Sequence, residues 1–95
     1  MSTEGPAERR ELVFSGHVQG VGFRATAASL ARRHSVRGFV RNLPDGSVEI
    51  IVEGAAPAIA RFVDEVRAVF SNHIRDERDS QKPATGEFVD FQVRY

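Results

Sequence analysis

The sequence predicts an α+β fold in which two helices cover one face of a mostly antiparallel β-sheet. Segments with strand alternation and segments with helical periodicity follow one another in two successive β-α-β units, and glycine or Pro-Asp-Gly turns separate them. The chain has 95 residues, 41% hydrophobic and 27% charged, which suffices for one hydrophobic core. We therefore expect a single domain over residues 10–95, preceded by a flexible tail over residues 1–9.

The first β-α-β unit spans residues 10–42. Residues 10–16 form its first strand, and residues 23–34 carry an apolar stripe with the spacing of a helix. Residues 36–42 form its second strand. Alternate residues of that strand share one face, and they are Val36, Gly38, Val40 and Asn42.

The second unit starts after residues 44–46, a Pro-Asp-Gly sequence that is typical of the turn in a β-hairpin. Residues 47–53 form its strand. Residues 58–70 then form an amphipathic helix, because apolar side chains recur on one of its faces and Pro57 is well placed at its start.

The last part of the chain predicts two further strands. Residues 73–81 contain one clear apolar residue, Ile74, and we interpret them as an edge strand, because charges discourage an edge from pairing with another molecule. We expect the charges over residues 75–79 to face solvent. The alternation of Val89, Phe91, Val93 and Tyr95 predicts the last strand.

Together, these elements predict a ferredoxin-like two-layer sandwich, β-α-β-β-α-β with an additional short C-terminal strand.

Residues 16–22, here called the glycine loop, join the first strand to the first helix and form a candidate anion site. Glycines allow successive backbone N–H groups to turn inward, and no Ser, Thr, Asp or Asn precedes the helix to cap its first N–H groups. Arg24 adds a planar charge that can hold two phosphate oxygens at once. The loop matches neither a Walker A sequence nor the dinucleotide-binding fingerprint, and similar loops also occur in proteins that bind no anion.

Asn42 is the second candidate, because it ends a strand on the same face as small and apolar residues. An asparagine side chain in that position either binds a ligand or stabilises the following turn by hydrogen bonds to nearby backbone groups, as asparagine often does. Taken alone, the position favours the second interpretation.

Taken together, the two segments resemble the acylphosphatase family, and the resemblance spans residues 12–95. The first family motif, Gly-x-Val-Gln-Gly-Val-x-Phe-Arg, is matched at every position by residues 16–24. The second motif has Gly, an aromatic, a small apolar residue, a basic residue, Asn, three residues, Gly, one residue, Val, five residues and Gly, and residues 38–54 match it throughout. Two positions depart from the family: Phe14 replaces a branched aliphatic residue, and His17 stands where many members have arginine.

The resemblance implies an enzyme that hydrolyses the carboxyl-phosphate bond of a small acyl phosphate to a carboxylate and inorganic phosphate. It implies that Arg24 and the glycine loop bind phosphate and that Asn42 positions the attacking water, so these two residues are the expected catalytic residues. A carboxylate leaves without being protonated, so such a site needs no general acid. The further substrate-binding residues that it implies are His17, Val18, Gln19, Gly20, Val21 and Gly22.

Composition agrees with a small enzyme of this kind. Thirteen basic side chains balance thirteen acidic ones, which argues against nucleic acid or an anionic membrane as a partner. The absence of cysteine excludes disulfides, thiol catalysis and thiolate metal sites, and the three histidines have no acidic partners at metal-ligand spacing. We expect no metal, no cofactor, no nucleic acid and no membrane contact, and a cytoplasmic monomer whose partner is its substrate.

Two other functions are compatible with the residues. A ferredoxin-like binding module would use the glycine loop to sense a phosphorylated metabolite or to regulate a partner, and a structural copy of an enzyme domain would keep only the fold. Asn42 separates these from an enzyme, because anion binding alone has no use for a residue that positions water.

Overall fold

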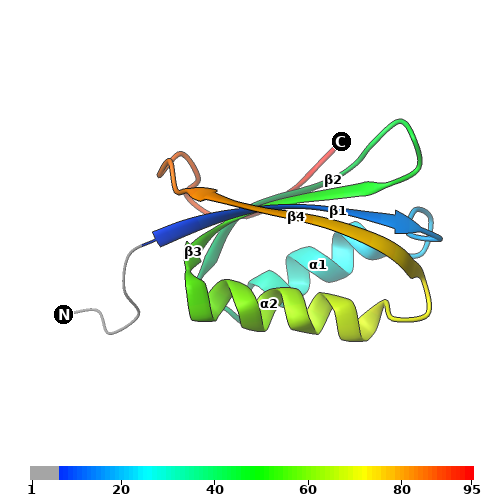
Figure 1. Ribbon diagram of the computed structural model, residues 1–95, viewed down its shortest axis with the longest axis horizontal. Coiled ribbons are helices and arrows are strands. Elements are labelled where there is room, and N and C mark those ends of the chain that lie inside the picture. Colours follow the sequence, from blue (N-terminus) through cyan, green and yellow to red (C-terminus); the bar gives the residue numbers. More distant parts are fainter. Residues whose placement is uncertain (1–6) are drawn as a thin grey trace.

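Within residues 7–95, five β-strands form one sheet and two α-helices pack against it, in the order expected from the sequence (Figure 1). The structure is a computed structural model that describes residues 7–95. The first six residues of the expected tail lie outside the described residues. The elements are β1 (Ala7–Gly16), α1 (Phe23–Ala31), β2 (Val36–Asn42), β3 (Val48–Ala55), α2 (Ala56–Val69), β4 (Ile74–Pro83) and β5 (Phe91–Arg94).

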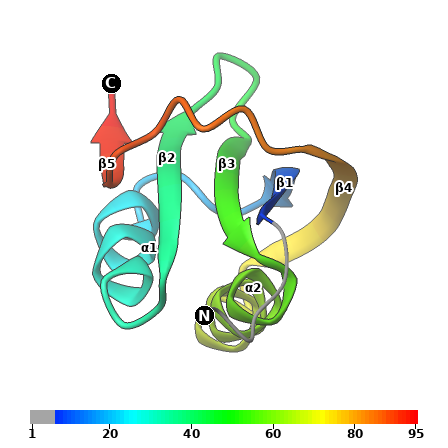
Figure 2. The ribbon, with the colours of Figure 1, turned by 90° about the vertical axis from the view of Figure 1, so that its left-hand side faces the viewer.

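The strand order in the sheet is β4-β1-β3-β2-β5, and every neighbouring pair is antiparallel except β2 with β5 (Figure 2). β1 and β2 both pair antiparallel with β3, so they run in the same direction. The chain therefore leaves β1 at Gly16 and β2 at Asn42 from the same end of the sheet. Helix α1 starts at that end too, and the predicted ferredoxin-like arrangement thus brings the two candidate segments together (Figure 1).

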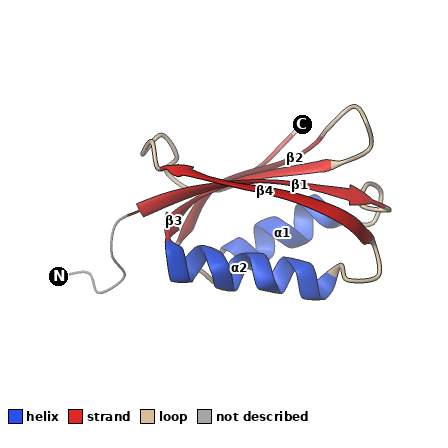
Figure 3. Cartoon of the chain, in the orientation of Figure 1, coloured by secondary structure: helices blue, strands red, loops and turns tan. Residues whose placement is uncertain are grey.

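Both helices lie on the same side of the sheet (Figure 3). Apolar side chains from the helices and from the side of the sheet that faces them form the core. Phe70, which follows α2, stacks on Phe23, the first residue of α1, with ring centroids 4.4 Å apart. This contact holds the start of α1 in place. The stripes predicted for the helices are buried at Phe23, Ala27, Leu30 and Ala31 in the first and at Ile59, Phe62, Val63 and Val66 in the second. The last residue expected in the first stripe, His34, is only half-buried and lies beyond the end of α1.

Two boundaries differ from those expected by three residues, and the others differ by at most two. β1 begins at Ala7 and not at residue 10, because residues 7–9 extend the pairing of β1 with β3, and two of them also pair with β4. These three residues are therefore strand and not tail. α1 ends at Ala31 and not at residue 34, because the N–H groups of Arg33 and His34 bond three residues back and tighten the last turn.

The acidic residues of β4 do not all face solvent as expected. The sheet register places Glu77 and Asp79 opposite Phe14 and Leu12, and therefore on the helix-facing side. The Nε–H of Arg67 in α2 donates to Glu77 at 2.9 Å, and the Nε–H of Arg10 in β1 donates to Asp79 at 2.9 Å. This edge strand has few apolar side chains, so these ion pairs supply part of its attachment to the rest of the fold.

The connection between β4 and β5 crosses the helix-free face of the sheet (Figure 2). A buried carboxylate holds this connection in place. The Glu53 side chain accepts hydrogen bonds from the N–H groups of Thr85 and Gly86, at 2.9 and 3.0 Å, and from Arg9 at 3.1 Å. Burial by itself raises the pKa of Glu53, but these donors outweigh it and leave the pKa below its ordinary value of 4.5.

We expect Glu53→Gln to lower the free energy of unfolding by about 3 kcal/mol at pH 7, because it removes a buried charge from its donors. The folded chain lowers the pKa of Glu53, so the unfolded chain binds the proton more readily as the pH falls. The stabilisation is present above the ordinary pKa and is lost as the pH falls through the folded pKa. Urea unfolding of parent and variant should therefore differ much less at pH 3 than at pH 7.

The matched control is Glu49→Gln on the same strand, where a partly exposed carboxylate pairs with Arg41. It should change the free energy of unfolding by less than about 1 kcal/mol at either pH. An equal difference between parent and Glu53→Gln at both pH values would contradict the role assigned to this carboxylate.

Candidate active site

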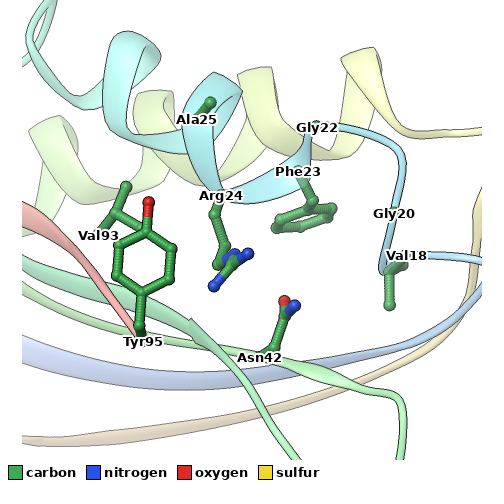
Figure 4. A pocket seen from close by; sticks show the side chains of 9 residues that line it. All are labelled: Val18, Gly20, Gly22, Phe23, Arg24, Ala25, Asn42, Val93 and Tyr95. Carbon is green, nitrogen blue, oxygen red and sulfur yellow. The ribbon is translucent and has the colours of Figure 1, made fainter.

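A cavity of about 180 Å³ lies at the end of the sheet where β1 and β2 finish and α1 starts. Figure 4 shows the side chains of Arg24 and Asn42 pointing into it from α1 and β2, with Tyr95 beside Arg24. Its lining residues come from the glycine loop, α1, the end of β2 and the C-terminal strand, and they are Val18, Gly20, Gly22, Phe23, Arg24, Ala25, Asn42, Val93 and Tyr95.

The glycine loop presents backbone to this cavity. Gly20 and Gly22 have φ angles of 77° and 79°, a conformation that glycine adopts without strain, and a Cβ at either would meet nothing within 4 Å. The first backbone bond of α1 runs from the N–H of Thr26 to Gly22, and no described side chain caps the helix. The N–H groups of the first turn thus stay available, as the sequence predicted, and they carry the positive end of the helix dipole.

The first half of the glycine loop is held by contacts with distant segments. At the β1 end, the N–H of His17 donates to the carbonyl of His73 at 2.9 Å, and the two imidazole rings stack at 5.9 Å. The next side chain, Val18, is completely buried. Gln19 then donates two hydrogen bonds to the turn between β2 and β3. A loop held in this way can keep its N–H groups aimed at a ligand without reorganising.

Arg24 lies in the first turn of α1 and is half-buried. Its guanidinium stacks on the ring of Tyr95, 4.6 Å from the ring centroid. Within residues 7–95 no carboxylate lies at ion-pair distance from it, in contrast to Arg9, Arg10 and Arg67. A partly buried arginine without a counter-ion is a favourable partner for a phosphate.

Asn42 is the last residue of β2 and is half-buried on the helix-facing side of the sheet. The interpretation that it ties down its own turn is wrong, because its side chain makes no hydrogen bond within the described residues. The turn is closed instead by the N–H of Ser47, which donates to Asp45 at 2.9 Å, and by the N–H of Leu43, which donates to the carbonyl of Ser47 at 2.9 Å. The amide of Asn42 is therefore left facing the cavity.

Most of the expected site residues meet in one place. Arg24 and Asn42 line the cavity together with Val18, Gly20 and Gly22. The others expected to bind substrate, His17, Gln19 and Val21, do not line it. For His17 the reason is that its N–H is bonded to His73, and for Gln19 that its side chain is bonded to the following turn. That each of the expected residues binds substrate stays a prediction.

Sequence reasoning missed two features of this site. The sequence predicts Tyr95 only as the end of a strand, and Gln19 as a substrate-binding residue and not as a link to the β2–β3 turn. Both act through contacts between distant segments, the first with α1 and the second with the β2–β3 turn. No local pattern in the sequence signals such contacts.

In the part of the chain that the structure describes, no three His, Asp or Glu side chains are grouped so as to hold a metal ion. Neither of its two helices meets the length and apolarity that spanning a bilayer requires. The expected independence of a metal stays a prediction, which the experiment below tests.

Sequence comparisons with known proteins agree on one family. The sequence profile of the acylphosphatase family matches residues 10–93. An acylphosphatase of Syntrophus aciditrophicus is 40% identical over 89 residues, which cover 93% of each chain. One of Aeropyrum pernix is 42% identical over 89 residues, covering 92% of this chain and 88% of the relative. Among solved structures, the acylphosphatase of Bacillus subtilis superposes with a TM-score of 0.83 at 29% identity, covering 93% of this chain and 99% of that one.

Proposed function

Because this chain belongs to the acylphosphatase family, we propose that it hydrolyses acyl phosphates without a metal ion, with Arg24 and the glycine loop binding phosphate and Asn42 positioning the attacking water. One observation carries the proposal. An arginine without a counter-ion and an asparagine amide without a hydrogen-bond partner within residues 7–95 face the same cavity, in front of the uncapped start of α1. A site that only bound an anion would have no need for the amide.

The reaction requires only that the attacking water be positioned and that the charge on the phosphoryl oxygens be stabilised. Water attacks phosphorus, the bond from phosphorus to the acyl oxygen breaks, and its electron pair leaves with the carboxylate. Because the pKa of the leaving acid is about 4 to 5, the carboxylate needs no proton from the enzyme. The proton of the attacking water passes to a phosphate oxygen. Rate enhancement then comes from orientation and from stabilising the charge on the phosphoryl oxygens.

Each group has a distinct role in this scheme. The free N–H groups of the glycine loop and of the first turn of α1 donate to the phosphoryl oxygens, and the Arg24 fork holds two of them. The exposed ring of Tyr95 lies against the guanidinium and adds a weak cation–π contact. The amide oxygen of Asn42 accepts a hydrogen bond from the attacking water and directs its lone pair at phosphorus.

The direct test is release of inorganic phosphate from an aromatic acyl phosphate such as benzoyl phosphate. We expect saturable hydrolysis whose rate is unchanged by EDTA and by added Mg²⁺, because the proposed groups are all side chains and N–H groups of this chain. Activity that EDTA abolishes and Mg²⁺ restores would contradict the metal-free scheme. Binding of phosphate with no turnover would favour a binding module instead.

We also propose that the enzyme acts as a monomer in the cytoplasm with no partner other than its substrate. The charges of β4 protect the longer edge of the sheet, and β5 at the other edge has only four residues, which favours a monomer. The formal net charge of zero gives no general attraction to nucleic acid or to an anionic membrane. Light scattering during gel filtration should give the mass of one chain at all concentrations tested, and a concentration-dependent increase would contradict the monomer.

A further inference from the structure

Gln19 connects the two halves of the site. Its side-chain amide donates to the carbonyl of Leu43 at 2.8 Å and to the carbonyl of Ser47 at 2.8 Å. These carbonyls form the base of the turn that begins directly after Asn42. We propose that Gln19 is a positioning residue whose side chain fixes Asn42 relative to the phosphate-binding groups. This proposal rests on the function proposed above.

The hydrogen bonds of Gln19 join the glycine loop to the turn between β2 and β3. The turn between β2 and β3 is closed from within, by the Leu43 N–H to the Ser47 carbonyl and by Asp45 to the Ser47 N–H. It therefore does not need Gln19 in order to form. What Gln19 adds is attachment of this closed turn to the glycine loop, and so of the end of β2 to the start of α1.

The chemistry of the position suits an amide. Two carbonyl oxygens face the side chain, and an NH₂ group offers one N–H to each without introducing a charge. An ionised glutamate has no donor and would place a negative charge against two acceptors. A protonated glutamate has one donor, and an aliphatic side chain has none.

We expect Gln19→Leu to lower kcat for benzoyl phosphate about tenfold, because Asn42 then holds the water less accurately. The inhibition constant of inorganic phosphate should change less than about threefold, because Arg24 and the free N–H groups remain. In a chain that already carries Asn42→Ala, the same substitution should lower kcat less than about twofold, because the residue that it positions is gone.

The matched control is Gln81→Leu, which removes a glutamine that donates to Glu8 at the far end of the sheet. It should leave kcat unchanged. A full tenfold loss from Gln19→Leu in the Asn42→Ala background would overturn the proposal, since Gln19 would then act independently of Asn42. Parental kcat in Asn42→Ala itself would instead overturn the proposed function, so the two failures are distinguishable.

A second variant, Gln19→Glu, tests the proposal by comparing the kcat of one protein at two pH values. Two facing carbonyls disfavour the ionised carboxylate, so the variant should be poorly active at pH 8 and recover severalfold relative to the parent as the pH falls to 5 and one donor returns. Melting temperatures at both pH values show that the protein stays folded. A kcat equal to that of the parent at pH 8, where the ionised side chain has no donor, would overturn the proposal, even if Gln19→Leu does not fold.

Discussion

Arg24→Ala should lower kcat/KM for an acyl phosphate by about 10³ to 10⁴, which corresponds to about 4 to 5.5 kcal/mol of transition-state stabilisation. The reason is that the guanidinium has no carboxylate partner within residues 7–95 and supplies the positive charge in a cavity whose other lining side chains are apolar or neutral. The substitution removes the positive charge that stabilises both the bound substrate and the transition state, so KM should rise and kcat should fall. Steady-state release of phosphate measures both.

Two further variants separate charge from geometry. Arg24→Lys keeps the charge but loses the planar fork, and we expect it to retain only about 1 to 10% of parental kcat/KM. Arg32→Ala is the matched control, because Arg32 is exposed at the other end of α1 and away from the cavity. Near-parental activity in Arg24→Lys would contradict bidentate holding of phosphate, and near-parental activity in Arg24→Ala would remove Arg24 from the mechanism.

Asn42→Ala should lower kcat about 10² to 10³ with little change in KM, because the amide orients the water and does not carry the phosphate charge. Its side chain makes no hydrogen bond within the described residues, so the free energy of unfolding should change by less than about 0.5 kcal/mol. A large loss of activity with unchanged stability is the combination that a functional asparagine predicts. Urea unfolding and steady-state kinetics on the same preparation measure the two quantities.

The control for this variant is Asn72→Ala, which changes an exposed asparagine in the connection between α2 and β4. It should alter neither kcat nor stability. If Asn42→Ala instead lost stability and kept its kcat, Asn42 would be a structural residue, and the binding-module alternative would gain support.

The helix start and the glycine loop could be predicted because their determinants are local. An apolar stripe that begins at Phe23, glycines before it and no capping side chain define an uncapped helix start wherever it lies in the fold. Strand alternation similarly placed Asn42 on the face of Val40, and the split β-α-β order brought both segments to one end of the sheet.

Other features could not be predicted because they depend on register between distant strands. The extension of β1 to Ala7 and the position of Glu77 and Asp79 on the helix-facing side follow from pairing with β3 and β4. The contact of Tyr95 with Arg24 depends in the same way on where the parallel strand β5 ends against β2. In each case the local sequence does not indicate the contact, because the contact is made with a distant part of the chain.

The most direct test of the shared site is a titration of ¹⁵N-labelled protein with inorganic phosphate, followed by NMR. The signals to follow are the backbone amides of Gly20 and Gly22, the Nε–H of Arg24 and the side-chain amide of Asn42. If all four face one bound phosphate, their shifts should saturate together with a single Kd. An Asn42 amide that does not shift, or that titrates with a Kd different from that of Arg24, would contradict the account.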